Sequence, residues 1–330
     1  MRTAVLGAGS WGTAFAKILG DAGNEVVLWA RRPEIADAIN EKRKNPEYLT
    51  GTELSPHVRA TAQAADALDG SEVVVLAIPS QTLRTNLADW KGLLAPDSTL
   101  VSLMKGIELG TTMRMSEVIC EAAAVPADRV SVVSGPNLAF EIAAEQPAAT
   151  VVACVDMERA TRVQNAITTP YLRPYTNDDV VGCELGGAVK NVIALAVGIS
   201  HAMGMGDNTK AMIITRGLAE TTRLGMALGG DPMTFAGLAG LGDLVATCMS
   251  PGSRNRIFGE ALGRGCNLEE AQRVTRFTAE GVKSCLAIRD LARAHGVDMP
   301  ITEQVERICH EGADPRLAVK TLMSRATKAE

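Results

Sequence analysis

The sequence has no basic run interleaved with aromatic residues, and its 33 lysines and arginines are outnumbered by 38 aspartates and glutamates. A nucleic-acid-binding surface needs local positive charge to neutralise phosphates. The formal net charge of −5 therefore argues against nucleic acid as a partner.

The chain also lacks a Cys-x-x-Cys pair and histidines at metal-ligand spacing. Its 7 cysteines are scattered and odd in number, a pattern typical of reduced thiols rather than of a disulfide framework or a zinc site. No signal peptide is evident, because a strand is predicted from residue 3, and no apolar run approaches the about 20 residues of a membrane span. We therefore expect a cytoplasmic protein with no metal site and no stable membrane insertion.

Residues 7–12 form a Gly-x-Gly-x-x-Gly turn, with a short apolar run before it and a helical pattern after it. Gly7 permits the tight turn, Gly9 lets a pyrophosphate approach the backbone, and Gly12 allows close helix–strand packing. The start of the helix points free N–H groups and the positive end of its dipole at the phosphates. Because a second strand is predicted at residues 25–30, the motif has the context that dinucleotide binding requires.

The end of that second strand carries no acidic residue. An Asp or Glu there would accept hydrogen bonds from the ribose 2′-hydroxyl of NAD, whereas this chain has Arg31 and Arg32. Two guanidinium groups suit a 2′-phosphate, which they can hold in bidentate fashion. The pair indicates that NADP(H) is accepted; the alternative is that both arginines are simply solvated.

Strands and helices alternate up to about residue 180. Nearly continuous apolar runs such as VVVLAIP are expected for strands covered on both faces. The pattern predicts an α/β domain over residues 1–179, a doubly wound (Rossmann-type), mostly parallel sheet. The predicted strands are residues 3–6, 25–30, 57–61, 72–78, 99–103, 130–133, 149–154 and 171–175.

After Val180 the strand pattern disappears, and segments rich in alanine, leucine and methionine show helical spacing. Residues 180–330 are therefore predicted to form an all-helical, substrate-binding domain. Its predicted helices are residues 182–203, 208–228, 231–238, 253–264, 267–274, 280–295 and 301–311.

Ligands of open α/β sheets bind beyond the carboxyl ends of the strands, which makes Lys105 a candidate to orient a substrate oxygen. Lys190 lies among apolar residues, and burial lowers a lysine pKa toward neutrality, which suits a general acid or base. Asp243 follows two glycines, so its carboxylate can point into a cleft. The alternatives are a solvated Lys105, a structural ion pair at Lys190 and a helix cap at Asp243.

Ser253, Arg254 and Asn255 follow a Pro-Gly pair and mark the beginning of a helix. Ser253 could be a simple N-cap. The same geometry, with Arg254 beside exposed N–H groups, makes an anion site suited to a substrate phosphate.

Taken in order, these segments resemble bacterial NAD(P)-dependent glycerol-3-phosphate dehydrogenases. The resemblance runs from residue 2 to about 323. It is carried by GAGSWGTA (7–14), KGIE (105–108), SGPNLA (134–139), ELGGAVKN (184–191), AGLGDL (239–244) and SRNRIFG (253–259).

The resemblance implies a role for each candidate. Lys190 is the acid/base at the C2 oxygen of the substrate, assisted by Lys105 and Asp243. The substrate phosphate is held by Arg254 and Asn255, and the pocket is lined by Gly135, Asn137 and Ser253. Asn137 departs from the Ser or Thr that the family often has. Cofactor contacts, besides the glycine turn, are implied for Ser10, Trp11, Arg31, Arg32, Lys105, Ala139, Arg254 and Glu280.

The implied reaction is reversible hydride transfer between NAD(P)H and dihydroxyacetone phosphate, giving sn-glycerol 3-phosphate for phospholipid synthesis. Lys105 and Lys190 are expected to act on the same ketone oxygen. The cofactor is NADP(H), NAD(H) or both, the partner is a phosphorylated triose, and the apolar helical half suggests a homodimer. Two other readings are a dehydrogenase of the 6-phosphogluconate or 3-hydroxyacid type, and a non-catalytic NAD(P)H sensor, against which the two lysines argue.

Overall fold

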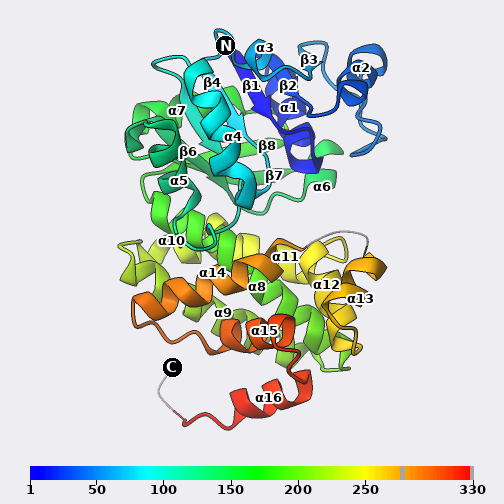
Figure 1. Cartoon of the computed structure of the whole chain (residues 1–330), viewed down its shortest axis with the longest axis vertical. Coiled ribbons are helices and arrows are strands. Elements are labelled where there is room, and N and C mark those ends of the chain that lie inside the picture. The colour runs from blue at the N-terminus through cyan, green and yellow to red at the C-terminus, as the bar shows by residue number, and fades with distance from the viewer. Residues whose placement is uncertain (276–278, 328–330) are drawn as a thin grey trace. The chain divides into compact units, whose positions relative to one another are not determined.

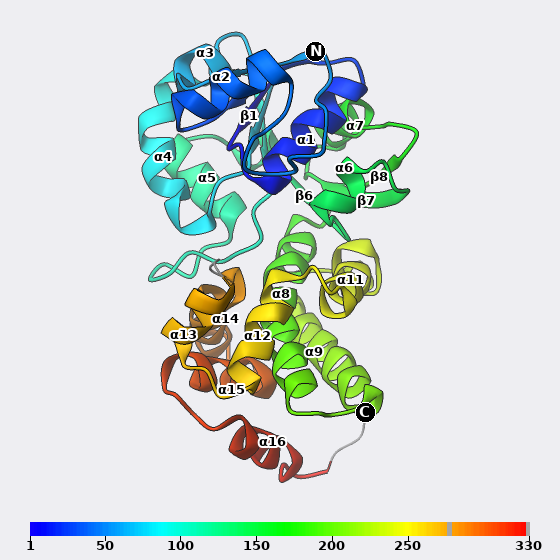
Figure 2. The same ribbon diagram turned by 90° about the vertical axis from the view of Figure 1, so that its right-hand side faces the viewer.

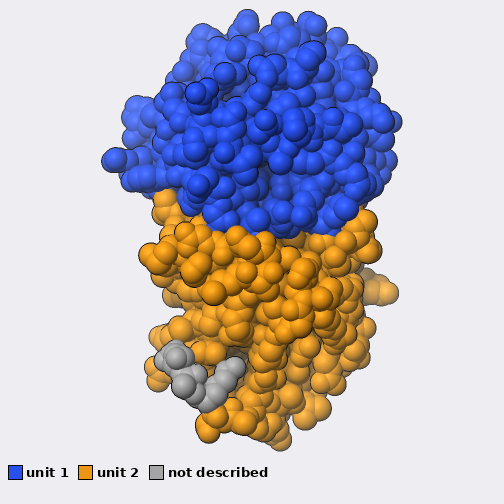
Figure 3. Space-filling model, turned by 90° about the vertical axis from the view of Figure 1, so that its left-hand side faces the viewer, with its two compact units in different colours: residues 1–105, 113–184 blue, residues 106–112, 185–330 orange. Residues whose placement is uncertain are grey.

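A computed structural model describes residues 1–275 and 279–327, which divide into two compact units (Figure 3). Unit 1 comprises Met1–Lys105 and Met113–Glu184, and unit 2 comprises Gly106–Thr112 and Leu185–Glu330. Helix α8 (Val180–Ala202) begins in unit 1 and continues into unit 2. The functional division that we predict between residues 179 and 180 coincides with the beginning of this helix and stays a prediction.

Unit 1 is built on a sheet of eight strands in the order β3-β2-β1-β4-β5-β6-β7-β8 (Figure 1). All neighbouring strands are parallel except β6 and β7, which pair antiparallel. The predicted mostly parallel sheet is confirmed, and each predicted strand is present. The strands are β1 (Arg2–Leu6), β2 (Glu25–Trp29), β3 (Val58–Thr61), β4 (Val73–Leu76), β5 (Thr99–Ser102), β6 (Val130–Ser134), β7 (Ala148–Ala153) and β8 (Leu172–Asn177).

Successive residues of a strand face opposite sides of the sheet, and both sides of this one are apolar. In β1, Val5 belongs to one buried cluster, whereas Ala4 and Leu6 belong to the other. Helices α1 and α7 supply the first cluster, and α3, α4 and α5 supply the second, so the sheet is covered on both faces (Figure 2). The helices of this unit are α1 (Ser10–Asp21), α2 (Pro33–Lys42), α3 (Ala64–Leu68), α4 (Leu83–Trp90), α5 (Met115–Ala123), α6 (Ala139–Ala143) and α7 (Met157–Ala166).

The sequence pattern predicts a helix over residues 112–124 before β6, but the helix found there begins later. Thr112 has a φ of 58°, a left-handed conformation that a helix cannot include. The N–H of Arg114 instead donates to Glu117 at 2.8 Å, and together these residues form a capping box. The helix α5 therefore starts at Met115.

The described residues of unit 2 contain helices and no strand, as predicted. Its longest helix, α8, packs backbone to backbone on α12, because a Cβ on Gly259 would lie 2.2 Å from the carbonyl oxygen of Leu195. The other helices are α9 (Asp207–Ala227), α10 (Pro232–Ala236), α11 (Asp243–Met249), α12 (Arg254–Gly263), α13 (Leu268–Thr275), α14 (Glu280–Ala294), α15 (Pro300–His310) and α16 (Pro315–Met323), with a π-helical turn over Leu238–Gly242.

The expectation that no apolar run reaches the length of a membrane span is wrong. By length and composition α8 could cross a membrane, and within the described residues it is the one helix that could. Yet 83% of its apolar window is buried inside the protein. This burial is what a core helix needs, and it explains why the helix is apolar all round.

A buried carboxylate ties α9 to α15 in unit 2. Glu220 is 1% exposed and accepts the backbone N–H of Ile301 at 2.7 Å and that of Thr302 at 3.3 Å. These are N–H groups of the first turn of α15, which have no partner inside their own helix. Burial nevertheless raises the pKa of Glu220 from 4.5 to about 7, because the charged form loses its hydration.

This shift predicts that Glu220 lowers stability as the pH rises. The folded protein holds the proton more tightly than the unfolded chain, so the contribution is fully present below about pH 4.5 and is lost as the pH rises to about 7. The loss amounts to about 3 kcal/mol. The free energy of unfolding of the native protein, measured against pH, should fall by this amount relative to that of Glu220→Gln. Parallel curves for the two proteins would contradict the prediction.

Candidate functional site

The glycine turn joins β1 to α1 at the carboxyl edge of the sheet. Gly7 has a φ of 126°, and a Cβ there would lie 2.4 Å from the carbonyl oxygen of Ala77. A Cβ on Gly12 would lie 1.8 Å from the carbonyl oxygen of Gly7. Both positions are therefore restricted to glycine by backbone sterics. The predicted roles of these two glycines in the turn and in helix–strand packing are consistent with this geometry.

Gly9 differs, because a Cβ there would meet no atom within 4 Å. It is the N-cap of α1, and no described side chain caps the free N–H groups of the first helical turn, which starts with Ser10. The indole Nε1 of Trp11 is buried and has no hydrogen-bond partner among the described residues. Open space, free donors and the helix dipole together fit a pyrophosphate.

Arg31 and Arg32 follow β2 at the same edge of the sheet. Arg31 is exposed and makes no ion pair with any described residue. Arg32 is the N-cap of α2, and its guanidinium donates to the carboxylate of Glu47. Arg31 thus has the freedom that binding a 2′-phosphate requires, while Arg32 already has a carboxylate partner.

Lys105 and the segment after β6 come together within unit 1. The Nζ of Lys105 donates to the carbonyl oxygen of Gly135 at 3.0 Å. Asn137 donates from Nδ2 to the hydroxyl of Thr150 at 3.0 Å, while its Oδ1 is buried without a partner in the described part of the chain. An unsatisfied buried acceptor is costly, so Asn137 is suited to receive a ligand hydroxyl. Ala139 follows as the first residue of α6.

In unit 2, Lys190 and Asp243 form a buried ion pair. Lys190 is 8% exposed and Asp243 1% exposed. The Nζ of Lys190 donates to Oδ1 of Asp243 and, at 2.8 Å, to the hydroxyl of Thr247. The adjacent thiol of Cys248 stays protonated, because burial raises its pKa to about 12. The charged groups of this cluster are the ammonium of Lys190 and the carboxylate of Asp243.

Close backbone packing brings this pair together. A Cβ on Gly186 would lie 2.4 Å from the carbonyl oxygen of Ala239. Glycine at this position lets α8 touch the π-helical turn that leads into α11. Asp243 is the first residue of α11, and its carboxylate reaches Lys190 on α8.

The segment predicted to hold a phosphate begins α12. Ser253 is its N-cap and accepts the N–H of Arg256 at 3.3 Å, which confirms the capping role. Arg254 is the first helical residue and is exposed. Asn255 is buried, donates to the side-chain oxygen of Asn191 at 2.9 Å and accepts the N–H of Gly281 at 3.0 Å. Asn255 therefore joins α8, α12 and the beginning of α14, where Glu280 lies.

Two residues of this group were missed from the sequence. Thr247 lies four residues after Asp243, so both face the same side of α11. Asn191 directly follows Lys190 in the chain and bonds to Asn255. The helical spacing from Asp243 was a signal that could have identified Thr247.

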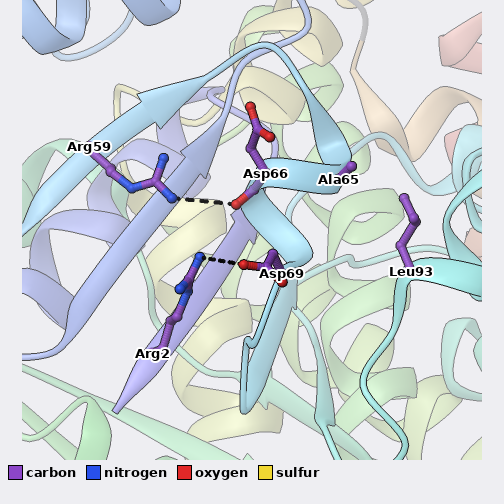
Figure 4. Close-up of a pocket in the computed structure, with 6 residues that line it drawn as sticks. All are labelled: Arg2, Arg59, Ala65, Asp66, Asp69 and Leu93. Carbon is purple, nitrogen blue, oxygen red and sulfur yellow. Dashed lines mark hydrogen bonds and ion pairs between the residues drawn. The ribbon is translucent and has the colours of Figure 1, made fainter.

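A separate hollow lies at the amino edge of the sheet (Figure 4). Its charged residues are paired with one another: Arg2 lies 3.4 Å from Asp69, and Arg59 donates to the carbonyl oxygen of Asp66 at 3.4 Å. Arg2 begins β1, whereas the glycine turn follows the end of that strand. This hollow therefore lies at the edge of the sheet opposite the glycine turn.

No group of three or more His, Cys, Asp or Glu residues within the described ranges could hold a metal ion. All seven cysteines are free thiols, and five of them are buried, as expected for small core residues.

Comparison with known proteins gives matches along nearly the whole chain. Residues 2–160 match the family model of the NAD-dependent glycerol-3-phosphate dehydrogenase N-terminus, and residues 179–320 match that of its C-terminus. A glycerol-3-phosphate dehydrogenase (NAD(P)+) from Streptomyces griseus is 66% identical over 330 residues, covering 100% of this chain and 98% of the relative. Its counterpart in Thermobifida fusca is 60% identical over the same length, with the same coverage of 100% and 98%. The crystal structure of a Coxiella burnetii glycerol-3-phosphate dehydrogenase is 37% identical, with a TM-score of 0.92 and 98% coverage of both chains.

Proposed function

Because the chain belongs to the NAD-dependent glycerol-3-phosphate dehydrogenase family, we propose that its buried Lys190–Asp243 pair is the acid–base centre of that reaction. The protein is an NAD(P)-dependent oxidoreductase that acts on the CH–OH group of glycerol 3-phosphate. In the reverse direction it reduces dihydroxyacetone phosphate. The observation that carries the proposal is an ammonium and a carboxylate, both almost fully buried and hydrogen-bonded to each other.

Lys190 delivers the proton in this proposal. A bound NAD(P)H supplies the hydride to C2 of the ketone. As the C2 oxygen gains negative charge, the ammonium of Lys190 gives it a proton, and the product is sn-glycerol 3-phosphate. Asp243 favours the protonated, donating form of Lys190, since an unpaired ammonium in a buried position would be costly. Thr247 holds the same nitrogen by a second hydrogen bond.

Lys105 stabilises the charge that develops on the C2 oxygen. A positioned hydrogen-bond donor at a developing oxyanion contributes about 3–4 kcal/mol in measured cases. Its hydrogen bond to the carbonyl of Gly135 restricts the flexible side chain. The Oδ1 of Asn137, which has no partner among the described residues, accepts a substrate hydroxyl in the same segment.

Arg254 holds the substrate phosphate. It stands at the exposed beginning of α12, where a guanidinium and free helical N–H groups act on the same anion. Ser253 lines this anion site and caps the beginning of the helix. Asn255 holds α12 against α8 by its hydrogen bond to Asn191. The amide of Asn255 can also contact the phosphate. Anchoring the phosphate holds the ketone in place for reaction.

The dinucleotide is held by the glycine turn and by residues around it. Gly7, Gly9 and Gly12 shape the turn, Ser10 and Trp11 offer donors at the start of α1, and Arg31 and Arg32 lie at the ribose end. The cofactor contacts that we propose elsewhere are Lys105, Ala139, Arg254 and Glu280.

A substrate panel tests the function. With NADPH or NADH, we expect oxidation of the cofactor on addition of dihydroxyacetone phosphate, followed by absorbance. Dihydroxyacetone without the phosphate should support little turnover, because it lacks the group that Arg254 binds. Turnover of a 3-ketoacid but not of dihydroxyacetone phosphate would point to the 3-hydroxyacid class, and cofactor binding with no turnover to a sensor.

We also propose that the chain forms a homodimer and acts in the cytoplasm. The helical unit exposes several large apolar side chains, among them Met226, Met233 and Val274, at 55%, 72% and 67%. The free thiols suit a reducing compartment. Light scattering coupled to size-exclusion chromatography would report the mass of the assembly, and a monomer at all concentrations would refute the dimer.

A further inference from the structure

A carboxylate lies at the ribose end of the dinucleotide site, although the end of β2 has none. Arg32 directly precedes α2, and its guanidinium donates to Glu47 in the loop after α2. Glu34, on the first turn of α2, lies 3.9 Å from the Nε of Arg32. Both partners of the Arg32–Glu47 pair remain accessible, with exposed side-chain fractions of 47% and 40%.

The loop that carries Glu47 is fixed to the glycine turn by one buried residue. Asn45, 1% exposed, donates from Nδ2 to the carbonyl oxygen of Ala8 at 3.0 Å and to the hydroxyl of Thr13 at 2.9 Å. Its Oδ1 accepts the N–H of Glu47 at 3.0 Å. The backbone of Glu47 is therefore connected through one amide to Ala8, inside the Gly-x-Gly-x-x-Gly turn.

From this geometry we propose that Glu47 sets the relative affinities for the two cofactors. This proposal rests on the proposed dinucleotide site. Dinucleotide-binding folds often carry a carboxylate at the end of the second strand, and here Glu47 supplies that carboxylate from the loop after α2. Arg32 and Glu47 then each recognise a different substituent at the 2′ position of the ribose. The guanidinium of Arg32 attracts a 2′-phosphate, and the carboxylate of Glu47 accepts a hydrogen bond from a 2′-hydroxyl.

Glu47 affects the binding of the two cofactors in opposite directions. A 2′-phosphate brings negative charge to a guanidinium that already neutralises a carboxylate, so Glu47 weakens its binding by repulsion and by competition. A 2′-hydroxyl carries no charge and donates a hydrogen bond, so the same carboxylate strengthens its binding. Glu47 thus keeps the affinities for NADPH and NADH close to each other, and an enzyme with this pair can use either.

The variant Glu47→Gln tests the proposal, because it removes the charge and keeps the shape. We measure the dissociation constants of NADPH and NADH for the substrate-free enzyme by the fluorescence of the bound dihydronicotinamide. The dissociation constant of NADPH should fall and that of NADH should rise. The ratio of the NADH constant to the NADPH constant should increase about tenfold.

Glu53→Gln is the matched control. Glu53 lies in the same loop, 3.6 Å from Arg43, and removing it changes the net charge by the same amount without touching Arg32. An equal shift in Glu53→Gln would reduce the effect to general charge and overturn the proposal. An unchanged ratio in Glu47→Gln, or equal weakening of both cofactors, would also overturn it.

A second variant separates this proposal from the proposed function. In the Arg32→Ala background there is no Arg32 guanidinium for Glu47→Gln to release. Glu47→Gln should therefore lower the dissociation constant of NADPH by a smaller factor there than in the native protein. Turnover of dihydroxyacetone phosphate by Glu47→Gln with either cofactor shows that the dehydrogenase function stands whatever the ratio does. A thermal unfolding midpoint equal to that of the native protein shows that the variant is folded.

Discussion

Replacing Lys190 by alanine is expected to lower kcat for dihydroxyacetone phosphate about 1000-fold, while the dissociation constant of NADPH stays unchanged. The size of the loss is that of removing a positioned general acid, about 10²–10⁴. Lys190 is not among the residues that we propose to contact the dinucleotide, so its removal should leave cofactor binding intact. Steady-state kinetics and fluorescence titration measure the two quantities separately.

The same change has a cost in stability that must be controlled. Alanine leaves Asp243, 1% exposed, without the ammonium that neutralises it, and breaking a buried pair in this way destabilises by about 3–5 kcal/mol. The double variant Lys190→Ala, Asp243→Asn removes the buried charge and should regain most of the stability without regaining turnover. Near-normal kcat in the folded single variant would remove Lys190 from the acid–base role.

Replacing Gly9 by aspartate is expected to raise the dissociation constants of NADPH and NADH more than about 100-fold, a loss of ~2.7 kcal/mol. A Cβ at this position meets no described protein atom within 4 Å, so the side chain extends into the space proposed for the pyrophosphate. The carboxylate also repels the phosphates. Aspartate is a favoured N-cap residue, so the unfolding midpoint should not fall.

Two further variants show whether the effect comes from the ligand space. Gly9→Asn has nearly the same shape without the charge, and its smaller rise in both dissociation constants gives the steric part. Gly12→Ala places a Cβ 1.8 Å from the carbonyl oxygen of Gly7 and should lower stability itself. If Gly9→Asp bound both cofactors normally, the pyrophosphate would have to lie elsewhere.

The sequence predicted best those features that local patterns determine. The strands of the sheet are short apolar runs between polar breaks, and β1 with its glycine turn is the clearest of them. Apolar neighbours singled out Lys190 and two preceding glycines singled out Asp243, and the structure brings these residues together as a buried pair. Lys105 and Gly135 lie side by side because parallel strands end at the same edge of the sheet.

Features that depend on tertiary contacts were not predictable in this way. The sequence around Glu47 does not predict its pairing with Arg32. The loop that carries Glu47 is positioned by a tertiary contact, the hydrogen bond of Asn45 to the glycine turn. The antiparallel pairing of β7 with β6 depends on neighbours rather than on composition. The sequence analysis did not recognise that α8 is long and apolar enough to span a membrane. The structure shows that this apolar surface is buried inside the protein.

The contact of Gly186 with the carbonyl of Ala239 has a consequence for the energetics of each catalytic cycle. Where the two backbones are in contact, no side chain lies between them that could change its rotamer. The main chain leading to Asp243 therefore has very little conformational entropy left to lose. That entropy is lost once, when the chain folds. In the proposed mechanism, a carboxylate placed in this way holds the ammonium of Lys190 without reorganising for each new substrate molecule, and electrostatic catalysis depends on such preorganisation.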